Sequence, residues 1–553
     1  MARIRRWLAF VLSLCLLLAL TAAFAPAGLA RHGTGTTVNG IDVDSTTIPE
    51  LQELMDEGEL SSFDLVQFYV HRIKNLNSML NAVIAISPTA ISDANAADRA
   101  RAHGDDRPLL GIPIIVKDNI DTTGMPTTAG SWALNTSRPT DAFVIQQLRD
   151  AGALIIGKAN LSEWANWRSN PSSSGWSGIG GQTNMPYVLD RNPCGSSSGS
   201  GVAAAADLAV AAVGSETDGS IVCPSGANGV VGIKPTLGLI SRAGIVPITA
   251  DQDTSGPIAR NVTDAAVLLG AMTGIDSHDP ATGAQAGHAY TDYTPFLDED
   301  ALDGARIGVW RDGTFDPSAS PWVDDFIDGV VAELEAAGAT VVEGMDILPN
   351  GAATGDIYNA EFSALLCESK DDMTTYMQTY APKFPKGFSN DLQGLLDFNN
   401  ANPQKEGPWN SDLWEAALDT GGRDAECADF RADATPPTQD LINDLMADNN
   451  LDAIIAPTNG PAWVTSDDPD RGDLEGTDDF AKFVGSSAAA AISGYADITV
   501  PAGAFDDTPL PLGITFIGGR WDEPTLIGLA FSYEQATQHR QPPEFVTTIG
   551  ANP

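Results

Sequence analysis

Short apolar runs alternate with helical patterns along the first third of the chain, and this alternation limits the folds that it can adopt. Three runs have the length and apolar content of buried strands, at residues 81–86, 112–116 and 154–157. Patterns typical of helices flank them, at residues 49–57, 63–76, 92–103 and 141–151. Strands and helices in alternation pack as a sheet with helices on both faces, so the pattern predicts an α/β fold.

The rest of the chain contains no feature that would separate a second domain. Its 553 residues include no Gly/Ser-rich linker or repeat, and 43% of them are hydrophobic, which is enough for one large core. Strand patterns return at 453–456, 498–500 and 512–516, and we expect them to complete the same sheet. Residues 347–450 have a less regular pattern, and we expect this segment to form a cover or an entrance rather than core.

The first thirty residues have the features of an export signal. Arg3, Arg5 and Arg6 precede an apolar run over residues 8–25, and small residues follow it. We expect a signal peptide that is cleaved after Ala30, and therefore a secreted or cell-envelope protein without stable membrane insertion after cleavage. The arginine pair is compatible with twin-arginine export, although the full consensus is absent. The alternative is an uncleaved anchor, because the run is close to the ~20 residues that span a bilayer.

The chain is strongly acidic. Its 73 acidic and 30 basic residues give a formal net charge of −43. Nucleic acid is not expected as a partner, because the electrostatic interaction with phosphates would be repulsive. An acidic surface with few lysines keeps a protein hydrated in concentrated salt, so a salty habitat and an ordinary acidic secreted protein are both compatible with this composition.

Four cysteines remain after the predicted signal peptide: Cys194, Cys223, Cys367 and Cys427. They are too few for a disulfide scaffold, and their spacing indicates no zinc site. Cys194 could pair with Cys223, and Cys367 with Cys427, in an oxidising compartment, but spacing alone does not decide this. We expect no metal and no cofactor.

Two serines lie in Gly-rich segments 24 residues apart. Ser196 is in GSSSGS at 195–200, and Ser220 is in SETDGSIVCP at 215–224. Glycine and small residues allow the backbone to approach a reacting centre, so the pair is a candidate catalytic site. A single Gly/Ser-rich run is as typical of a flexible turn or a phosphate-binding loop.

A lysine upstream strengthens the catalytic interpretation. Lys117 follows the apolar run that ends with Ile115 and Val116, so a buried strand would carry it into the interior. Most lysines are solvated surface charges. A buried lysine is either a structural residue paired with a carboxylate or a functional one, because burial lowers the lysine pKa and provides a neutral base.

Lys117, Ser196 and Ser220 together resemble the Lys, cis-Ser and nucleophilic Ser of the amidase signature family. The resemblance covers roughly residues 45–545 and includes Thr236 within VVGIKPTLGLISRAGIVP and the C-terminal segments APTNGPAW, ADITVPAG and LPLGITFIG. Within the family, GSSSGS and ETDGSIVCP are most similar to the peptide amidases of bacteria, which remove the C-terminal amide from peptides. The resemblance implies the amidase signature fold, a large mixed β-sheet covered by helices on both faces in a single domain.

The resemblance also implies how the site works. Ser220 attacks the amide carbon, Ser196 relays the proton, and neutral Lys117 accepts it. Ser197 supports these groups as a hydrogen-bond donor. All six histidines lie outside the Gly/Ser segments, which makes a lysine base simpler than a Ser-His-Asp triad that only the fold could assemble.

The backbone N–H groups of Thr217, Asp218 and Gly219 form the oxyanion hole by the same resemblance. Asp218 replaces a commoner glycine, and its carboxylate could contact a substrate amine or shape the pocket. Val222 replaces a commoner arginine, so a substrate carboxylate would lack a partner there and neutral amides fit better. The order Thr183-Asn184-Met185-Pro186 also departs from the family, and the local loop could differ.

We therefore predict an exported amide hydrolase that cleaves carboxamides, with C-terminal peptide amides as expected substrates, to a carboxylic acid and ammonia. The predicted segments are 1–30 for the signal peptide, 31–44 for the mature N-terminus, 45–545 for the amidase domain and 546–553 for a tail. A fatty-acid or other small-molecule amidase or esterase on the same triad is the alternative. A non-catalytic envelope binding protein is a second alternative. A component of a glutaminyl amidotransferase shares the signature, but the export signal argues against it.

Overall fold

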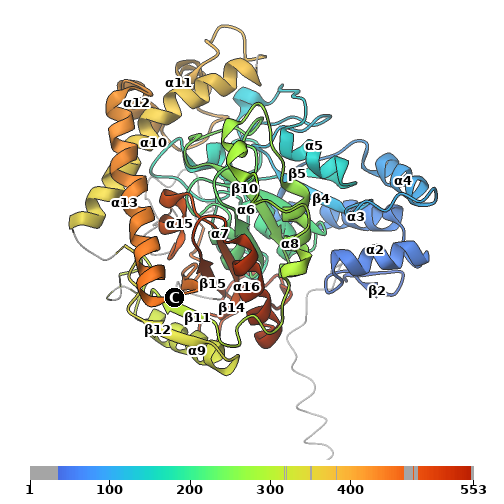
Figure 1. Ribbon diagram of the computed structural model, residues 1–553. Coiled ribbons are helices and arrows are strands. Elements are labelled where there is room, and N and C mark those ends of the chain that lie inside the picture. The colour runs from blue at the N-terminus through green and yellow to red at the C-terminus, as the bar shows by residue number, and fades with distance from the viewer. Residues whose placement is uncertain are drawn as a thin grey trace, which may run out of the picture. The chain divides into compact units, whose positions relative to one another are not determined.

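A mixed sheet of eleven strands runs through the described part of the chain (Figure 1). In spatial order the strands are β12 (Thr340–Glu343), β11 (Arg306–Val309), β13 (Ala453–Pro457), β15 (Pro511–Ile517), β14 (Asp497–Ala504), β9 (Val231–Lys234), β10 (Thr254–Ala259), β8 (Ala211–Glu216), β4 (Pro113–Lys117), β5 (Leu154–Ala159) and β3 (Val83–Ile86). Strand β4 is parallel to β5 and β8, and β11 is parallel to β12 and β13, whereas the other pairs are antiparallel. The predicted strands are thus confirmed, and the last three complete the same sheet.

The computed structural model describes residues 35–549 except 317, 319, 349–351, 382, 466–477 and 479–483. From Thr37 onwards the chain forms one compact unit. The predicted signal peptide, residues 1–30, lies outside the described residues, as do residues 550–553 of the predicted tail. Within the described residues, no helix has the length and apolar character needed to cross a membrane.

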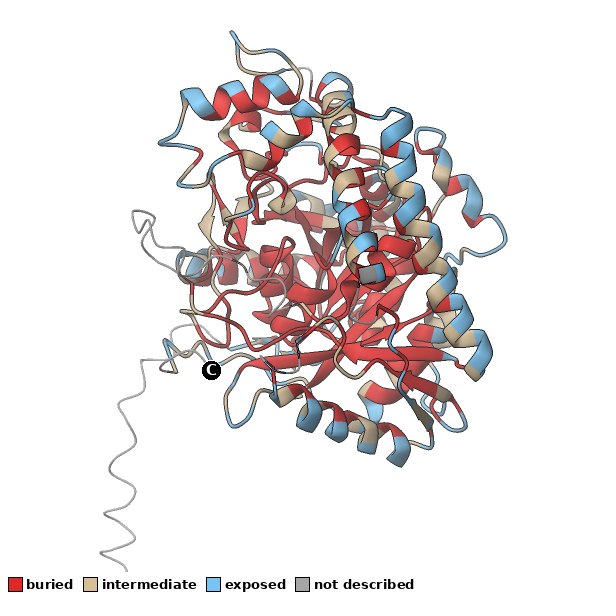
Figure 2. Ribbon diagram, turned by 90° about the vertical axis from the view of Figure 1, so that its left-hand side faces the viewer, coloured by how far each residue is buried: buried red, intermediate tan, exposed pale blue. Residues whose placement is uncertain are grey.

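Both faces of the sheet are buried: most of its strands are coloured as buried in Figure 2, and helices lie around them. Strand β13 illustrates the packing. Successive side chains of a strand point to opposite faces. Ala453 and Ile455 pack in the cluster that contains apolar residues of α9 (Trp322–Ala336) and α16 (Glu523–Thr537). Ile454 and Ala456 pack instead with residues of α13 (Ala425–Asn449) and α15 (Ser487–Ser493). Helices therefore cover the sheet on both faces, as the α/β prediction required.

Further helices surround the part of the sheet that carries the site. They are α2 (Ile48–Glu57), α3 (Ser62–Leu80), α4 (Ala90–Arg101), α5 (Phe143–Asp150), α6 (Ser198–Ala205), α7 (Val222–Ala227) and α8 (Val262–Met272). Two short hairpins, β1–β2 (Thr37–Val38 and Ile41–Asp42) and β6–β7 (Trp176–Ser177 and Gly181–Gln182), lie outside the large sheet. Strand β4, which ends at Lys117, is completely buried.

The segment at 347–450, whose sequence pattern is less regular, is mostly helical. This region forms α10 (Ala352–Thr379), α11 (Leu392–Ala401), α12 (Asp412–Asp419) and the long helix α13, which lie together in Figure 1. The apolar pattern misled because α10 changes partners along its length. Its first half packs with α13, and its second half packs with α11 and α12, so no single stripe of apolar residues runs along it.

A disulfide between Cys367 and Cys427 joins α10 to α13. The bond spans 60 residues, so it removes much of the conformational freedom of the unfolded chain. We predict that the double variant Cys367→Ala/Cys427→Ala loses about 3–5 kcal/mol of free energy of unfolding. Denaturant unfolding of the variant and the parent measures this loss. An unchanged midpoint and slope would show that the helical cover does not depend on the bond.

Candidate functional site

The three segments singled out in the sequence meet at one edge of the sheet. Lys117 is the last residue of β4, and β8 lies beside β4 in parallel, so their carboxyl ends are neighbours. Ser220 follows β8 in the turn that leads into α7. Ser196 precedes α6, which packs against both β4 and β8. Parallel pairing therefore brings together residues that are distant in sequence.

A continuous chain of hydrogen bonds links the three predicted residues. The Nζ of Lys117 donates to the Oγ of Ser196 at 2.7 Å, and the Oγ of Ser196 donates to the Oγ of Ser220 at 3.0 Å. The peptide bond between Gly195 and Ser196 is cis. Lys117 and Ser196 are fully buried, whereas Ser220 retains 7% exposure. Of these three side chains, only the hydroxyl of Ser220 is therefore accessible to a substrate.

Lys117 has no carboxylate partner among the described residues. Its other hydrogen bonds go to the carbonyl oxygen of Ser215 at 2.9 Å and to the Oγ of Ser215 at 3.0 Å. Burial lowers the pKa of Lys117 from 10.5 to about 7, although the charges of Asp253 and Glu216 oppose this shift. A large fraction of Lys117 is therefore neutral near neutral pH, as a base requires.

Lys158, on the adjacent strand β5, shows the contrasting case of a structural buried lysine. Its Nζ lies 3.3 Å from Oδ1 of Asp118 and donates to the carbonyl oxygen of Ile120 at 2.7 Å. Lys158 is therefore a structural lysine paired with a carboxylate, which was the alternative role for Lys117. The two lysines differ in their partners and not in their burial.

Ser197 holds the two serine segments in register. Its Oγ donates to the carbonyl oxygen of Ser215 at 3.0 Å and accepts the N–H of Ser215 at 3.2 Å. Its own N–H donates to the carbonyl oxygen of Ser220 at 3.1 Å. In the described residues, the Ser197 side chain makes no hydrogen bond to Lys117 or to the Ser220 hydroxyl, so Ser197 supports the site without belonging to the chain of hydrogen bonds.

The turn before Ser220 differs from the predicted oxyanion hole at one residue. The N–H of Gly219 donates to Oε1 of Glu216 at 2.9 Å, so this amide is already engaged. In the described residues, the N–H groups of Thr217 and Asp218 have no acceptor, and both residues line the cavity that contains Ser220. Gly219 instead has φ of 75°, a conformation that favours glycine, and shapes the turn.

Glu216 is the residue that the sequence did not reveal. Its second carboxylate oxygen accepts the N–H groups of Ile221 at 2.6 Å and Val222 at 3.1 Å, so one buried side chain fixes both ends of the turn. An acidic residue directly before a Gly-containing turn and a helix start is a weak signal for such a role.

Val222 does not contact the space where a substrate would bind. Its side chain is fully buried and is absent from the walls of the cavity, so of the two expected roles, supporting or substrate-binding, the geometry favours the supporting one. The first turn of α7 directs it into the protein, and Val222 supports the site only through its N–H to Glu216.

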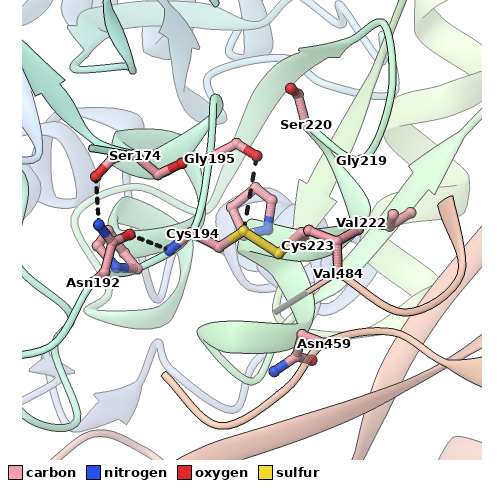
Figure 3. The surroundings of a disulfide bond; sticks show 12 residues. Ser174, Asn192, Cys194, Gly195, Gly219, Ser220, Val222, Cys223, Asn459 and Val484 are labelled. Atoms are coloured by element: carbon pink, nitrogen blue, oxygen red, sulfur yellow. Dashed lines mark hydrogen bonds between the residues drawn. A yellow bond between two sulfur atoms is a disulfide. The ribbon is translucent and has the colours of Figure 1, made fainter. Parts of the chain in front are cut away.

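A second disulfide joins the two serine segments (Figure 3). It links Cys194, two residues before Ser196, to Cys223, three residues after Ser220, with a Cα–Cα distance of 5.9 Å. Asn192 accepts the N–H of Cys194 at 2.9 Å and fixes the start of the loop. The pairing that the sequence left open is thus Cys194 with Cys223 and Cys367 with Cys427.

A cavity of about 450 Å³ opens above Ser220. Its apolar wall includes Trp167 and Ile248, together with Phe362 and Leu365 from α10, so the helical segment provides the predicted cover. Its polar wall includes Asp218 and Glu361. No group of three or more His, Cys, Asp or Glu residues that could hold a metal ion occurs in the described ranges.

Comparisons with known proteins agree with this geometry. A family model described as Amidase matches residues 64–527. The chain is 36% identical to a probable amidase of Arabidopsis thaliana, over 91% of this chain and 92% of that protein. It is 34% identical to a putative amidase of Schizosaccharomyces pombe, over 93% of this chain and 88% of that protein. Among solved structures it is similar to the native peptide amidase of Stenotrophomonas maltophilia, with a TM-score of 0.81 and 44% identity over 91% of this chain and 99% of that one.

The role of Glu216 can be tested by its removal. Glu216→Ala leaves three buried N–H groups without an acceptor, each at a cost of about 1–3 kcal/mol, so the variant should lose at least about 3 kcal/mol of stability. Denaturant unfolding measures the loss, with Glu335→Ala on the exposed surface of α9 as the control. Equal stability of the two variants would contradict the role of Glu216 in the turn.

Proposed function

The chain belongs to the amidase family, and from this premise we propose that it hydrolyses the C-terminal carboxamides of peptides with Ser220 as the nucleophile. The family membership that the motifs predicted makes the protein an amide-hydrolysing enzyme. The observation that carries the proposal is the chain of hydrogen bonds from Lys117 through Ser196 to Ser220, which ends at the cavity.

The relay begins with neutral Lys117. Its nitrogen then has a lone pair, so the Ser196 hydroxyl can turn to donate to Lys117 and the Ser220 hydroxyl can turn to donate to Ser196. As the Oγ of Ser220 bonds to the amide carbon, the proton of Ser220 passes to Ser196 and the proton of Ser196 passes to Lys117. The negative charge moves to the substrate oxygen, where the N–H groups of Thr217 and Asp218 stabilise it.

Collapse of the tetrahedral intermediate breaks the carbon–nitrogen bond. The leaving amine takes a proton from Ser196, which regains one from Lys117, and departs as ammonia. An ester of Ser220 remains. Water then attacks the ester carbon and gives a proton to Ser196, which passes one to Lys117. The bond between the carbonyl carbon and the Oγ of Ser220 breaks, the relay returns a proton to Ser220, and the carboxylic acid is released.

The cavity supports a neutral amide group at the reacting end of the substrate. In the described part of the chain, no lysine, arginine or histidine lines it, so an acidic group near the amide would have no partner. The similarity to a protein described as a peptide amidase favours a peptide as the remainder of the substrate. A volume of about 450 Å³ is in the range of cavities that enclose small ligands.

The apolar wall of the cavity favours one alternative substrate class. Trp167, Ile248, Phe362, Leu365 and Leu413 would suit a fatty acyl chain, and the same relay would hydrolyse a fatty-acid amide or an ester. Comparison of kcat/KM for an amidated peptide and for a long-chain primary amide distinguishes the two, and the proposal expects the peptide to be the better substrate.

The proposal includes export to the cell envelope or the medium. Residues 1–30 have the pattern of a signal peptide. The two buried disulfides support it, because such bonds persist in oxidising compartments and are rare in the cytosol.

The nucleophile and the base are tested by ammonia release from an amidated peptide. Ser220→Ala and Lys117→Ala should each lower kcat by about 10³-fold or more, because each removes a group on which the bond-forming step depends. Ser200→Ala is the matched control, since this buried serine in the same segment hydrogen-bonds to the carbonyl oxygen of Val213, away from the relay. Undiminished release from Ser220→Ala would refute the mechanism, and no release by the parent from any amide would favour the binding-protein alternative.

The pH dependence of kcat/KM tests the state of Lys117. The base works only when it is deprotonated, so raising the pH through its pKa of about 7 increases activity. We expect kcat/KM for a neutral amide to rise about tenfold per pH unit below this value and to level off above it. A rate that keeps rising towards pH 10 would show that the pKa of Lys117 is close to its ordinary value.

A further inference from the structure

Two carboxylic side chains from different parts of the fold face the cavity beside Ser220. Asp218 lies two residues before Ser220 in the turn after β8, and Glu361 comes from α10. Among the described residues that line the cavity, Asp218 and Glu361 are the acidic ones, and none is a lysine, arginine or histidine. The relay proposed above uses neither carboxylate.

Glu361 is held in place on one side only. It is 6% exposed, and its Oε1 accepts the Nε2 of Gln252 at 2.7 Å. Its other oxygen has no hydrogen-bond partner in the described residues. Arg431, whose charge acts on Glu361, donates to Gln252 and to Glu368 instead. A nearly buried carboxylate therefore presents an unpartnered oxygen where it lines the cavity.

Asp218 is open to the cavity. One of its oxygens accepts the hydroxyl of Ser487, and the other has no partner in the described part of the chain. No hydrogen bond joins Asp218 to Glu361 among the described residues, so the two groups do not satisfy each other. The arrangement leaves one free oxygen on each side chain for a third group.

The electrostatics of the pair favour a cation. Burial, together with the charge of Asp218, raises the pKa of Glu361 to about 8. Asp218 is open to the cavity, but the surrounding protein desolvates its carboxyl group and raises its pKa to about 6. Near neutral pH the pair therefore carries about one negative charge. The buried cations nearby are committed elsewhere, since Lys117 lies in the relay and the Nζ of Lys234 donates to the carbonyl oxygen of Tyr495. An ammonium group between the carboxylates would supply donors and relieve their repulsion.

We propose that Asp218 and Glu361 form a subsite that binds an ammonium group of the substrate close to the scissile carboxamide. This inference rests on the proposed function, because it assigns the amide to Ser220. Asp218 is in the same turn as the nucleophile and lines the same cavity, so the ammonium binds in the cavity that receives the reacting carbonyl. Two sources have this chemistry, namely the α-ammonium of an amino-acid amide and the side-chain ammonium of a C-terminal lysine amide.

Binding to the Ser220→Ala protein tests the subsite without turnover. Isothermal titration at neutral pH uses three probes of similar size: Nα-acetyl-lysinamide, norleucinamide and Nα-acetyl-norleucinamide. The first has only a side-chain ammonium, the second has only an α-ammonium, and the third has none. We expect at least one ammonium probe to bind with a Kd about tenfold lower than that of the neutral probe, the factor typical of one charge-assisted hydrogen bond.

Two substitutions in the Ser220→Ala background locate the effect. Glu361→Gln and Asp218→Asn keep the shape of each side chain, and each should lower the Kd ratio, because each removes one of the two carboxylates that face the ammonium. Glu335→Gln, at an exposed position of α9 outside the cavity, should keep the ratio. Equal or undetectable binding of all three probes, or a preference that survives both cavity substitutions, would overturn the subsite. Hydrolysis of Nα-acetyl-norleucinamide by the parent enzyme reports on the proposed function separately, since this probe has no ammonium.

Discussion

The burial of Lys117 without a counter-ion is the constraint on which the site depends. Taking an ammonium group out of water is costly, and the protein does not offset this cost with a carboxylate. The lysine is instead surrounded by hydroxyl and carbonyl oxygens of Ser196 and Ser215, which suit a neutral amine as well as a charged one. One strand away, Lys158 is equally buried but has Asp118. The comparison shows that partners decide whether a buried lysine is a structural ion or a candidate base.

The fold keeps the groups around Lys117 fixed by several independent connections. Parallel pairing of β4 and β8 sets the distance between Lys117 and the segment that leads to Ser220. The Cys194–Cys223 disulfide joins the two serine segments covalently, and Glu216 fixes the turn between β8 and α7. A relay with two hydrogen bonds in series needs such rigidity, because a small displacement of either serine would interrupt proton transfer.

Residues within local motifs could be predicted from the sequence, whereas residues brought in by distant segments could not. The apolar run before Lys117 indicated a buried strand, and the family resemblance assigned the roles of Ser196 and Ser220. Glu216 was missed because its role is to accept amides that only the folded turn presents. Glu361 was missed because α10 changes partners midway, which hid its helical pattern and the face that it turns to the cavity.

The central claim, that Lys117 is a neutral base near neutral pH, can be measured directly. The chain has nine lysines, so selective labelling of lysine side chains with carbon-13 gives a simple NMR spectrum, and Lys117→Met identifies the signal of Lys117 by its disappearance. The structure predicts that this signal titrates with a pKa of about 7. A signal that stays in its charged position until the pH approaches the ordinary lysine pKa of 10.5 would contradict the account.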